Sequence, residues 1–200
     1  NFITTVRGNS TPTVFDGKVY VGFSDGYVVA LNAKDGNIIW EQRIHHASKF
    51  SDVDAQAVVE ESTVYIPSYD GELYALDRNK GKVIWHVDVG GSKKVILEGK
   101  NLYLASSNGN IYQISKDTGR IQWKFQMDDG TPTNLVLHGN YLAFGSSKSY
   151  FYVVHKGDGS IAYRYNVGLR SGFVGTPFQI ENDVYVLSNY GNLYVFNWKK

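Results

Sequence analysis

Short segments with apolar residues around a central Tyr, Leu or similar side chain recur along the chain, each bounded by a turn signal. They are residues 19–21, 64–66, 102–104, 141–143 and 184–186. Asp-Gly and Asn-Gly pairs, which favour the positive φ angles of tight hairpins, stand between them. In the first repeat we predict strands at residues 11–15, 18–23, 27–32 and 37–43. The pattern therefore predicts an all-β fold.

The hairpin turn after the second strand of each unit returns at a nearly constant interval. Its turn residue is Gly26, Gly71, Gly109, Ser149 and Gly191, so successive units lie 38 to 45 residues apart. This period is typical of one four-stranded blade of a β-propeller. We predict one domain over residues 1–200, with five antiparallel blades at about residues 7–44, 53–89, 93–127, 131–167 and 173–198.

The fifth blade lacks a predicted outer strand, and two arrangements are compatible with this. Residues 1–6 have the pattern of an outer strand and precede the first inner strand. They either complete the fifth blade and close a ring of five blades, or they belong to another blade of a larger propeller, of which the chain is an arc. The repeat spacing leaves both open, and an arc would leave unpaired sheet edges.

A large aromatic residue follows the second tight turn of the first four units. These residues are Trp40, Trp85, Trp123 and Tyr163, and each stands four positions after a glycine. We predict that these docking aromatics cross to the adjacent blade, where burial of one ring removes roughly 150–250 Å² from water. Their expected role is structural.

Composition and charge narrow the functions that such a fold can serve. The chain has 20 Lys and Arg against 19 Asp and Glu, so a formal charge of +1 provides no field for gripping a phosphate backbone. It has no cysteine, which excludes disulfides and thiolate chemistry. No apolar run approaches the roughly 18 residues of a membrane helix, and no export signal opens the sequence. We expect neither nucleic acid as a partner nor a membrane span in these residues.

The sequence offers little for metal or cofactor chemistry. It contains no P-loop and no His-Glu-x-x-His motif. His45 and His46 are adjacent, so on a strand they would point to opposite faces and would not chelate one metal. The Asp-Gly pairs lack the spaced oxygen ligands of a calcium loop. We expect no catalytic residue, no metal and no cofactor.

The repeat resembles the tryptophan-docking motif of quinoprotein-type β-propellers, most clearly where residues 75–85 read Ala-Leu-Asp-Arg-Asn-Lys-Gly-Lys-Val-Ile-Trp. Three non-repeated segments resemble the BamB family, the propeller lipoproteins of the bacterial β-barrel assembly machinery. They are residues 7–12 (Arg-Gly-Asn-Ser-Thr-Pro), residues 39–44 leading to Ser-Asp-Val-Asp at 51–54, and residues 171–173 with 176–177. The resemblance maps the whole chain onto the C-terminal part of an eight-bladed propeller, which favours the arc.

The family resemblance implies a non-catalytic scaffold. Such a scaffold binds the POTRA domains of BamA, the barrel protein that inserts outer-membrane proteins, and unfolded outer-membrane proteins are a second expected partner. The resemblance also implies a periplasmic lipoprotein at the inner leaflet of the outer membrane of a Gram-negative bacterium. About three N-terminal blades and the lipid anchor would then lie outside this sequence.

Residue by residue, the resemblance assigns the BamA-binding patch to Val6, Arg7, Asp52 and Asp54. In the family an arginine, the apolar residues before it and two aspartates form this contact. Residues 4 and 5 are threonines here, where leucines are common in the family, so only Val6 keeps the apolar character.

The predicted topology independently brings these segments together. Connectors between successive blades emerge on one rim of a propeller, because the four strands of each blade alternate in direction. The connector over residues 44–55 is also the longest in the chain, and insertions on one face of a repeat protein often carry binding. We therefore expect Arg7 to lie near Asp52 and Asp54.

Three other interpretations stay open from sequence. The aspartates would instead cap turns, or pair locally with Arg7, in an exposed loop without a partner. Tyr27, Tyr69 and Tyr190, near the second-hairpin turns, would line the mouth of a ligand-binding or sensor propeller. The shared repeat also suits part of a quinone-dependent dehydrogenase, although those enzymes have a full ring, a bound calcium and often a cysteine pair.

Overall fold

The described residues of the computed structural model, 10–44, 53–69 and 71–199, form five separate antiparallel sheets. The first contains β1 (Thr13–Phe15), β2 (Lys18–Gly22), β3 (Tyr27–Asn32) and β4 (Ile38–Arg43). The second contains β5 (Val58–Val59), β6 (Thr63–Pro67), β7 (Leu73–Asp77) and β8 (Val83–Val87). The third contains β9 (Ile96–Glu98), β10 (Asn101–Ala105), β11 (Asn110–Ser115) and β12 (Ile121–Gln126).

The last two sheets follow the same plan. The fourth contains β13 (Val136–His138), β14 (Tyr141–Gly145), β15 (Tyr150–His155) and β16 (Ile161–Asn166). The fifth contains β17 (Phe178–Ile180), β18 (Asp183–Leu187) and β19 (Leu193–Asn197). Strands that follow one another in sequence pair within each sheet, so the chain meanders outward through every blade. The strands predicted for the first blade are confirmed to within two residues at each end.

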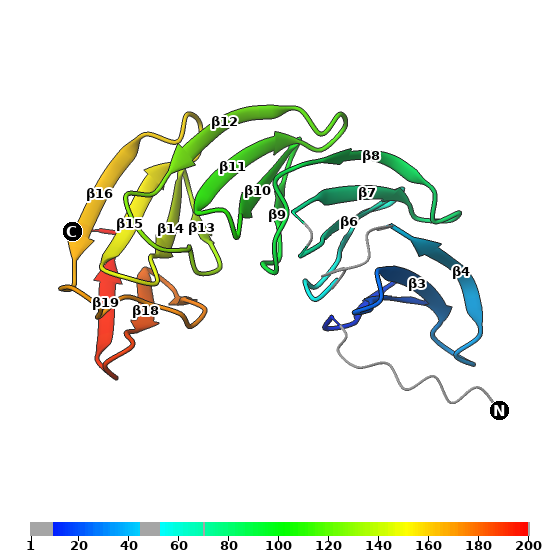
Figure 1. Cartoon of the computed structure of the whole chain (residues 1–200), viewed down its shortest axis with the longest axis horizontal. Coiled ribbons are helices and arrows are strands. Elements are labelled where there is room, and N and C mark those ends of the chain that lie inside the picture. Colours follow the sequence, from blue (N-terminus) through cyan, green and yellow to red (C-terminus); the bar gives the residue numbers. More distant parts are fainter. Residues whose placement is uncertain (1–9, 45–52, 70, 200) are drawn as a thin grey trace.

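The five blades are arranged as an open arc of a β-propeller (Figure 1). The shortest inner strands lie on the concave side, and β4, β8, β12 and β16 lie on the convex side. The first and last blades stand at opposite ends of the arc and do not meet. The closed five-blade ring, one of the two predicted arrangements, is therefore wrong. The predicted outer strand at residues 1–6 lies outside the described residues.

An exposed apolar face on the fifth blade marks one end of the arc (Figure 1). Leu193 is 63% exposed, whereas Leu73, Ile111 and Phe151, at the same place in the preceding blades, are fully buried against the next blade. No described blade covers this face of β17–β19.

Within the described ranges, no helix is long and apolar enough to cross a membrane.

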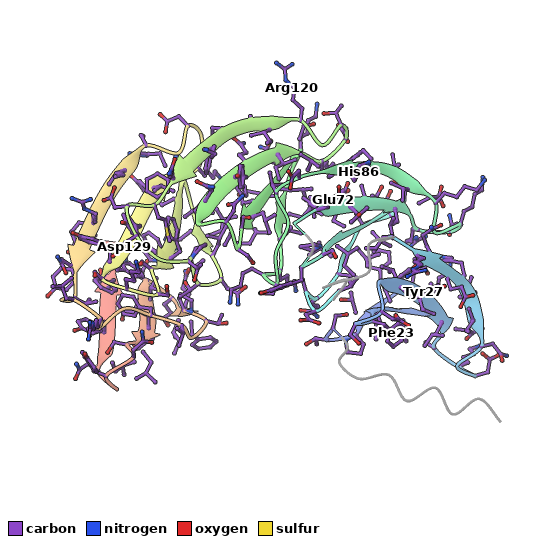
Figure 2. The ribbon with its side chains drawn as sticks, viewed as in Figure 1. Phe23, Tyr27, Glu72, His86, Arg120 and Asp129 are labelled. Atoms are coloured by element: carbon purple, nitrogen blue, oxygen red, sulfur yellow. The ribbon has the colours of Figure 1, made fainter. Side chains whose placement is uncertain are left out.

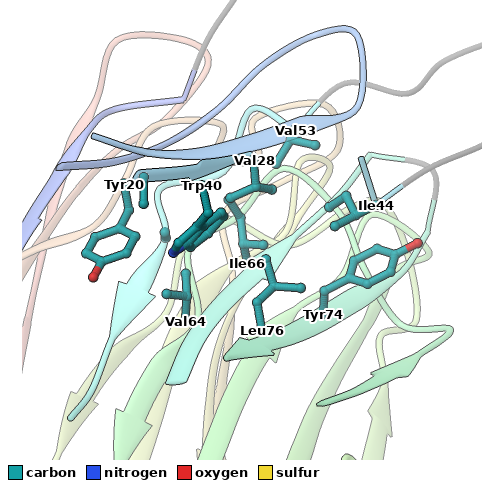
Figure 3. Packing of buried hydrophobic residues seen from close by; sticks show 11 residues of the cluster. Tyr20, Val28, Trp40, Ile44, Val53, Val64, Ile66, Tyr74 and Leu76 are labelled. Carbon is teal, nitrogen blue, oxygen red and sulfur yellow. The ribbon is translucent and has the colours of Figure 1, made fainter. Parts of the chain in front are cut away.

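The hydrophobic core is divided among the junctions between neighbouring blades. At the first junction, Trp40 lies between Tyr20 of its own blade and Val64 of the next (Figure 3). Val28 and Ile66 of the two blades complete the contact in the same cluster. Three further clusters of this kind join the second to the fifth blades. Because the middle strands of the first four blades bury most of both faces, as β6 and β10 do, their segments read as nearly continuous apolar runs.

The three tryptophans among the docking aromatics cross to the next blade in the same way. The indole N–H groups of Trp40, Trp85 and Trp123 donate to backbone carbonyls of the next blade at 2.8, 3.0 and 3.0 Å. Each indole lies flat against a glycine of that blade, where an added Cβ would come within 2.5–2.7 Å of the ring. These glycines are Gly81, Gly119 and Gly159, all at φ near 70°. The junction therefore requires glycine for both space and backbone conformation.

Tyr163, the fourth predicted docking aromatic, does not dock, and that prediction is wrong. Its side chain is 48% exposed, and it has no hydrogen bond to the fifth blade among the described residues. A phenol lacks the indole N–H that reaches the neighbouring carbonyl in the first three junctions.

Ion pairs repeat across two of the junctions. Lys116 Nζ donates to both carboxylate oxygens of Glu60 in the preceding blade, at 2.6 and 2.8 Å. Lys156 Nζ does the same with Glu98, at 2.8 Å to each oxygen. The hydrogen bond to Glu60 raises the pKa of Lys116 above its ordinary value. These lysines also supply the carbonyls that accept the Trp85 and Trp123 indoles, so one residue links two elements of the preceding blade.

The first and fourth junctions place other chemistry at the same positions. The Arg78 guanidinium lies 5.1 Å from the centre of the Phe15 ring and pairs with Asp16 at 3.2 Å. At the fourth junction, His138 stacks on Trp198 with ring centres 4.9 Å apart and planes at 9°. Cation–π, ionic and aromatic contacts therefore replace one another at the same point of the repeat.

Removal of one buried phenol is expected to reduce the loss of stability at alkaline pH. Burial raises the pKa of Tyr152 to about 12, and the nearby Asp128 carboxylate adds to the shift. In the unfolded chain a tyrosine titrates near pH 10. Between about pH 10 and 12 the unfolded state therefore holds fewer protons, so the free energy of unfolding falls as pH rises.

We expect Tyr152→Phe to make this fall shallower, because phenylalanine keeps the stacking on Phe144 without an ionisable group. Urea unfolding at pH 9 and pH 11.5 measures the difference. Equal slopes for Tyr152→Phe and the wild-type chain would show that Tyr152 ionises as freely in the folded state as in the unfolded state.

Candidate partner-binding rim

One rim of the arc carries both the connectors between blades and the turns between the second and third strands of each blade. We call it the connector rim, and its connectors span residues 44–57, 88–95, 127–135 and 167–177. Each connector is tied to the turn beside it by one backbone hydrogen bond, from a connector N–H to a turn carbonyl. These bonds run from Ile44 to Gly26, from Gly90 to Gly71, from Met127 to Gly109 and from Val167 to Ser149. The acceptors are the turn residues of the predicted repeat, which confirms that Ser149 fills the glycine position in the fourth unit.

The first connector is anchored by a buried valine. Val53 is fully buried, and its backbone N–H donates to the Phe23 carbonyl at 3.2 Å. Its side chain fills the space above Gly22, where an added Cβ would lie 2.4 Å from the valine Cγ1. The next residue, Asp54, is exposed on the rim. The anchor therefore fixes the position from which the Asp54 carboxylate projects.

The segment that enters the first blade is anchored at the same glycine. Ser10 is buried, its N–H donates to the Gly22 carbonyl at 2.9 Å, and its Oγ accepts from the Gly22 N–H at 2.8 Å. Ser10 follows Arg7 by three positions in the sequence. Val6, Arg7 and Asp52 themselves lie outside the described residues, so their juxtaposition with Asp54 stays a prediction.

A further carboxylate, which the sequence reasoning missed, lies at this end of the rim. Asp25 is exposed in the turn that receives the Val53 N–H, and its Oδ1 accepts from the Tyr27 N–H at 3.3 Å. Tyr27, labelled in Figure 2, belongs to the same blade, and the Arg43 guanidinium lies 5.9 Å from the centre of its ring. The Asp-Gly turn signal gave the location of Asp25, but nothing in the pattern showed which connector it would adjoin.

Residues 22–26 read Gly-Phe-Ser-Asp-Gly, which formally matches the Gly-x-Ser-x-Gly pattern of serine hydrolases. That pattern works when a strand-to-helix turn exposes the serine. Here the residues form the hairpin between β2 and β3, with Gly26 at φ 85°. Among the residues that the structure describes, no three acidic or histidine side chains are grouped to hold a metal ion.

A cavity of about 790 Å³ lies between the fourth and fifth blades, and none of its lining residues belongs to the first connector. Tyr163, Phe196 and Trp198 contribute to its lining. It occupies the place where a docked indole fills the first three junctions.

The sequence-family comparison decides the family. A model described as outer membrane protein assembly factor BamB matches residues 3–125, which is more than half of the chain. The chain belongs to the BamB family. The region matched includes the Arg-Gly segment, the first connector and the two aspartates, and it ends in β12.

Relatives of the BamB family support the assignment over shorter stretches. Outer membrane protein assembly factor BamB of Alkalilimnicola ehrlichii is 46% identical over 39 residues, which are 20% of this chain and 10% of that protein. The crystal structure of BamB from Moraxella catarrhalis matches with a TM-score of 0.79 and 25% identity, over 98% of this chain and 60% of that one. The chain therefore spans less than two thirds of the length of that BamB.

The propeller fold is shared more widely than the BamB family. A quinohemoprotein alcohol dehydrogenase from Pseudomonas putida matches with a TM-score of 0.76 over 96% of this chain and 40% of its own. The identity is 15%, so the likeness shows the fold alone.

Proposed function

We propose that this BamB-family chain is a non-catalytic scaffold that docks the POTRA domains of BamA on its connector rim. In doing so it assists assembly of outer-membrane β-barrel proteins. The observation that carries the proposal is the shared anchor at Gly22. Ser10, three positions after Arg7, and Val53, directly before Asp54, both contact this one glycine.

The physical character of the rim suits reversible binding of a protein. Exposed charged groups held on a rigid framework provide orientation and electrostatic complementarity more than bulk hydrophobic burial. Asp54 follows the buried Val53, so the backbone at Asp54 is already fixed before a partner binds. Binding then costs little conformational entropy apart from the rotamers of the Asp54 side chain. A scaffold gains affinity from such preorganisation.

The same proposal includes the place of action. A chain that docks BamA works in the periplasm, at the inner leaflet of the outer membrane of a Gram-negative bacterium. Unfolded outer-membrane proteins are the second proposed partner. Lipid anchorage of the complete protein is part of the proposal and follows from the family resemblance.

Titration of this chain with soluble tandem POTRA domains of the cognate BamA tests the function. We expect saturable binding with one defined stoichiometry, measured by calorimetry. No heat and no retention at concentrations up to about 100 μM, where even contacts of roughly 5 kcal/mol are detected, would overturn the scaffold proposal. In parallel, a saturable absorbance change on adding a quinone cofactor with calcium would count for the dehydrogenase interpretation instead.

A further inference from the structure

The connector between the fourth and fifth blades presents an apolar side chain to solvent. Leu169 is 88% exposed, more than any other large apolar residue that the structure describes. It stands between Gly168 at φ 95° and Arg170 at φ 65°. A non-glycine residue is disfavoured in this left-handed conformation, so the turn at Leu169 is held against the local preference of Arg170.

The base of this turn is rigid, so the exposure of Leu169 does not come from a loose loop. The N–H groups of Val167 and Gly172 donate to carbonyls of the Ser147–Ser149 turn at 2.8 and 2.7 Å. The Gly168 N–H donates to Asn166 Oδ1 at 2.8 Å. The buried Phe173 then closes the base against the fourth blade.

This connector is built like the one that carries Asp54. Phe173 donates its N–H to Ser146 and packs over Gly145, as Val53 donates to Phe23 and packs over Gly22. The residue after the anchor is Val174, which is 68% exposed in the position that Asp54 occupies in the first connector. Equivalent positions on one rim therefore present a carboxylate at one end and an apolar group at the other.

An exposed aromatic residue adjoins the same connector. Tyr190 is 67% exposed in the turn between β18 and β19. This turn is tied to the connector, because the Asn189 N–H donates to the Gly172 carbonyl at 2.8 Å. Exposed Leu, Val and Tyr side chains on two connected segments make a patch of the kind that marks protein contacts.

The charged groups described on this connector and its turn are opposite in sign to those described on the first connector and its turn. Arg170 and Lys148 are exposed, and neither belongs to an ion pair within the described part of the chain. The other nearby cation, Arg164, is paired with Asp128. The described part of the first connector and its turn presents Asp25 and Asp54. Within the described residues, the connector rim thus presents two carboxylates at one end, beside Arg43, and exposed cations with apolar groups at the other.

We propose that Leu169, Arg170, Val174 and Tyr190 form a second docking surface, which takes an acidic and apolar surface of the same POTRA partner. This inference rests on the proposed function. Opposite charge at the two ends orients an elongated partner along the arc, with its basic segment at Asp54 and its acidic segment at Arg170. Two contacts on one partner also raise the overall affinity without strengthening either.

The test is a titration with the tandem POTRA domains, using Leu169→Asp and Arg170→Glu. We expect each to weaken affinity by about 5- to 10-fold, the loss typical of an exposed anchor residue. Matched controls are Ile84→Asp on the outer strand β8 and Arg120→Glu, which projects from the convex side of the arc (Figure 2). Both controls are expected to stay within about twofold. Unchanged thermal midpoints show that all four variants fold.

The outcomes separate the two proposals. Wild-type binding that Asp54→Arg abolishes, but that Leu169→Asp and Arg170→Glu leave unchanged, overturns the second surface and leaves the scaffold function standing. No binding by the wild-type chain overturns both.

Cross-linking then tests the orientation. The chain has no cysteine, so a single cysteine at position 169 or 54 places a photo-cross-linker without background. We expect position 169 to label an acidic segment of the partner and position 54 a different, basic segment. Labelling of one and the same segment from both positions would contradict the oriented docking.

Discussion

Replacement of Trp85 by alanine is expected to lower the free energy of unfolding by about 3–5 kcal/mol. The indole fills the junction between the second and third blades and lies on Gly119, and its N–H donates to the Lys116 carbonyl at 3.0 Å. It also packs beside Tyr65, with ring centres 6.0 Å apart. Truncation removes these contacts, opens a cavity and leaves the Lys116 carbonyl with the longer hydrogen bond from the Tyr65 hydroxyl, at 3.3 Å.

Urea unfolding of Trp85→Ala measures this loss, with Ile84→Ala as the matched control. Ile84 is the neighbouring residue on β8 and is 53% exposed, so its truncation is expected to change stability by no more than about 0.5 kcal/mol. A thermal midpoint for Trp85→Ala equal to that of the wild-type chain would show that the indole does not hold the blades together.

Gly119→Ala probes the same contact from the other side. An added Cβ would lie 2.6 Å from the indole, and the backbone there has φ 70°. Since only the steric part of the cost depends on the ring, the substitution is expected to be less destabilising in the Trp85→Ala background than in the wild-type chain.

The repeat explains why so much of the fold could be predicted from sequence. A hairpin glycine, a buried triplet and a tryptophan at constant spacing specify the blade, because each blade solves the same packing problem. The period places Ser149 at the glycine position of the fourth unit. In the structure, Ser149 accepts the connector hydrogen bond that the turn glycines accept in the first three blades. The all-β fold was therefore within reach of the pattern alone, whereas the family came from the resemblance of three non-repeated segments.

Features that change from blade to blade could not be predicted in this way. The junction position held by Glu60 and Glu98 carries Phe15 in the first blade and His138 in the fourth, so no periodic signal connects them. Tyr163 stands at the same spacing from its glycine as the three tryptophans, but it lacks the indole N–H. A pattern of aromatic positions does not distinguish the two side chains. Whether five blades close a ring depends on the angle between blades, and the repeat length does not encode this angle.

The candidate site was predicted in part. The sequence indicated that Asp54 lies in a connector on the rim of the second-strand turns, and the hydrogen bonds of Val53 and Ile44 bear this out. The shared anchor at Gly22 was not foreseen, because it depends on side chains that meet across two blades. The contribution of Val6, Arg7 and Asp52 stays a prediction.

Reversal of one charge on the rim is expected to abolish binding of the POTRA domains. Asp54 is exposed and follows the buried Val53, so Asp54→Arg changes the charge presented to a partner without disturbing the core. The substitution removes an attraction and adds a repulsion at the proposed contact. Such changes at docking charges cost on the order of 2–5 kcal/mol, which corresponds to at least about a 30-fold loss of affinity.

Two further variants show whether the loss of binding in Asp54→Arg comes from the charge at this position and whether Arg7 belongs to the same patch. Asp54→Asn keeps the shape without the charge and is expected to fall between the wild-type chain and Asp54→Arg. Arg7→Glu is expected to match Asp54→Arg if the two residues belong to one patch. The control is Glu61→Arg, which makes the same change of charge at an exposed position in the turn between β5 and β6, on the opposite rim.

Calorimetric titration of tandem POTRA domains into the wild-type chain, Asp54→Arg and Glu61→Arg, with thermal unfolding of each, tests most directly whether the connector rim is the docking surface. We expect saturable binding by the wild-type chain and Glu61→Arg, no retention by Asp54→Arg, and the same thermal midpoint for all three. Equal affinity of Asp54→Arg and the wild-type chain for the POTRA domains would contradict docking through this rim.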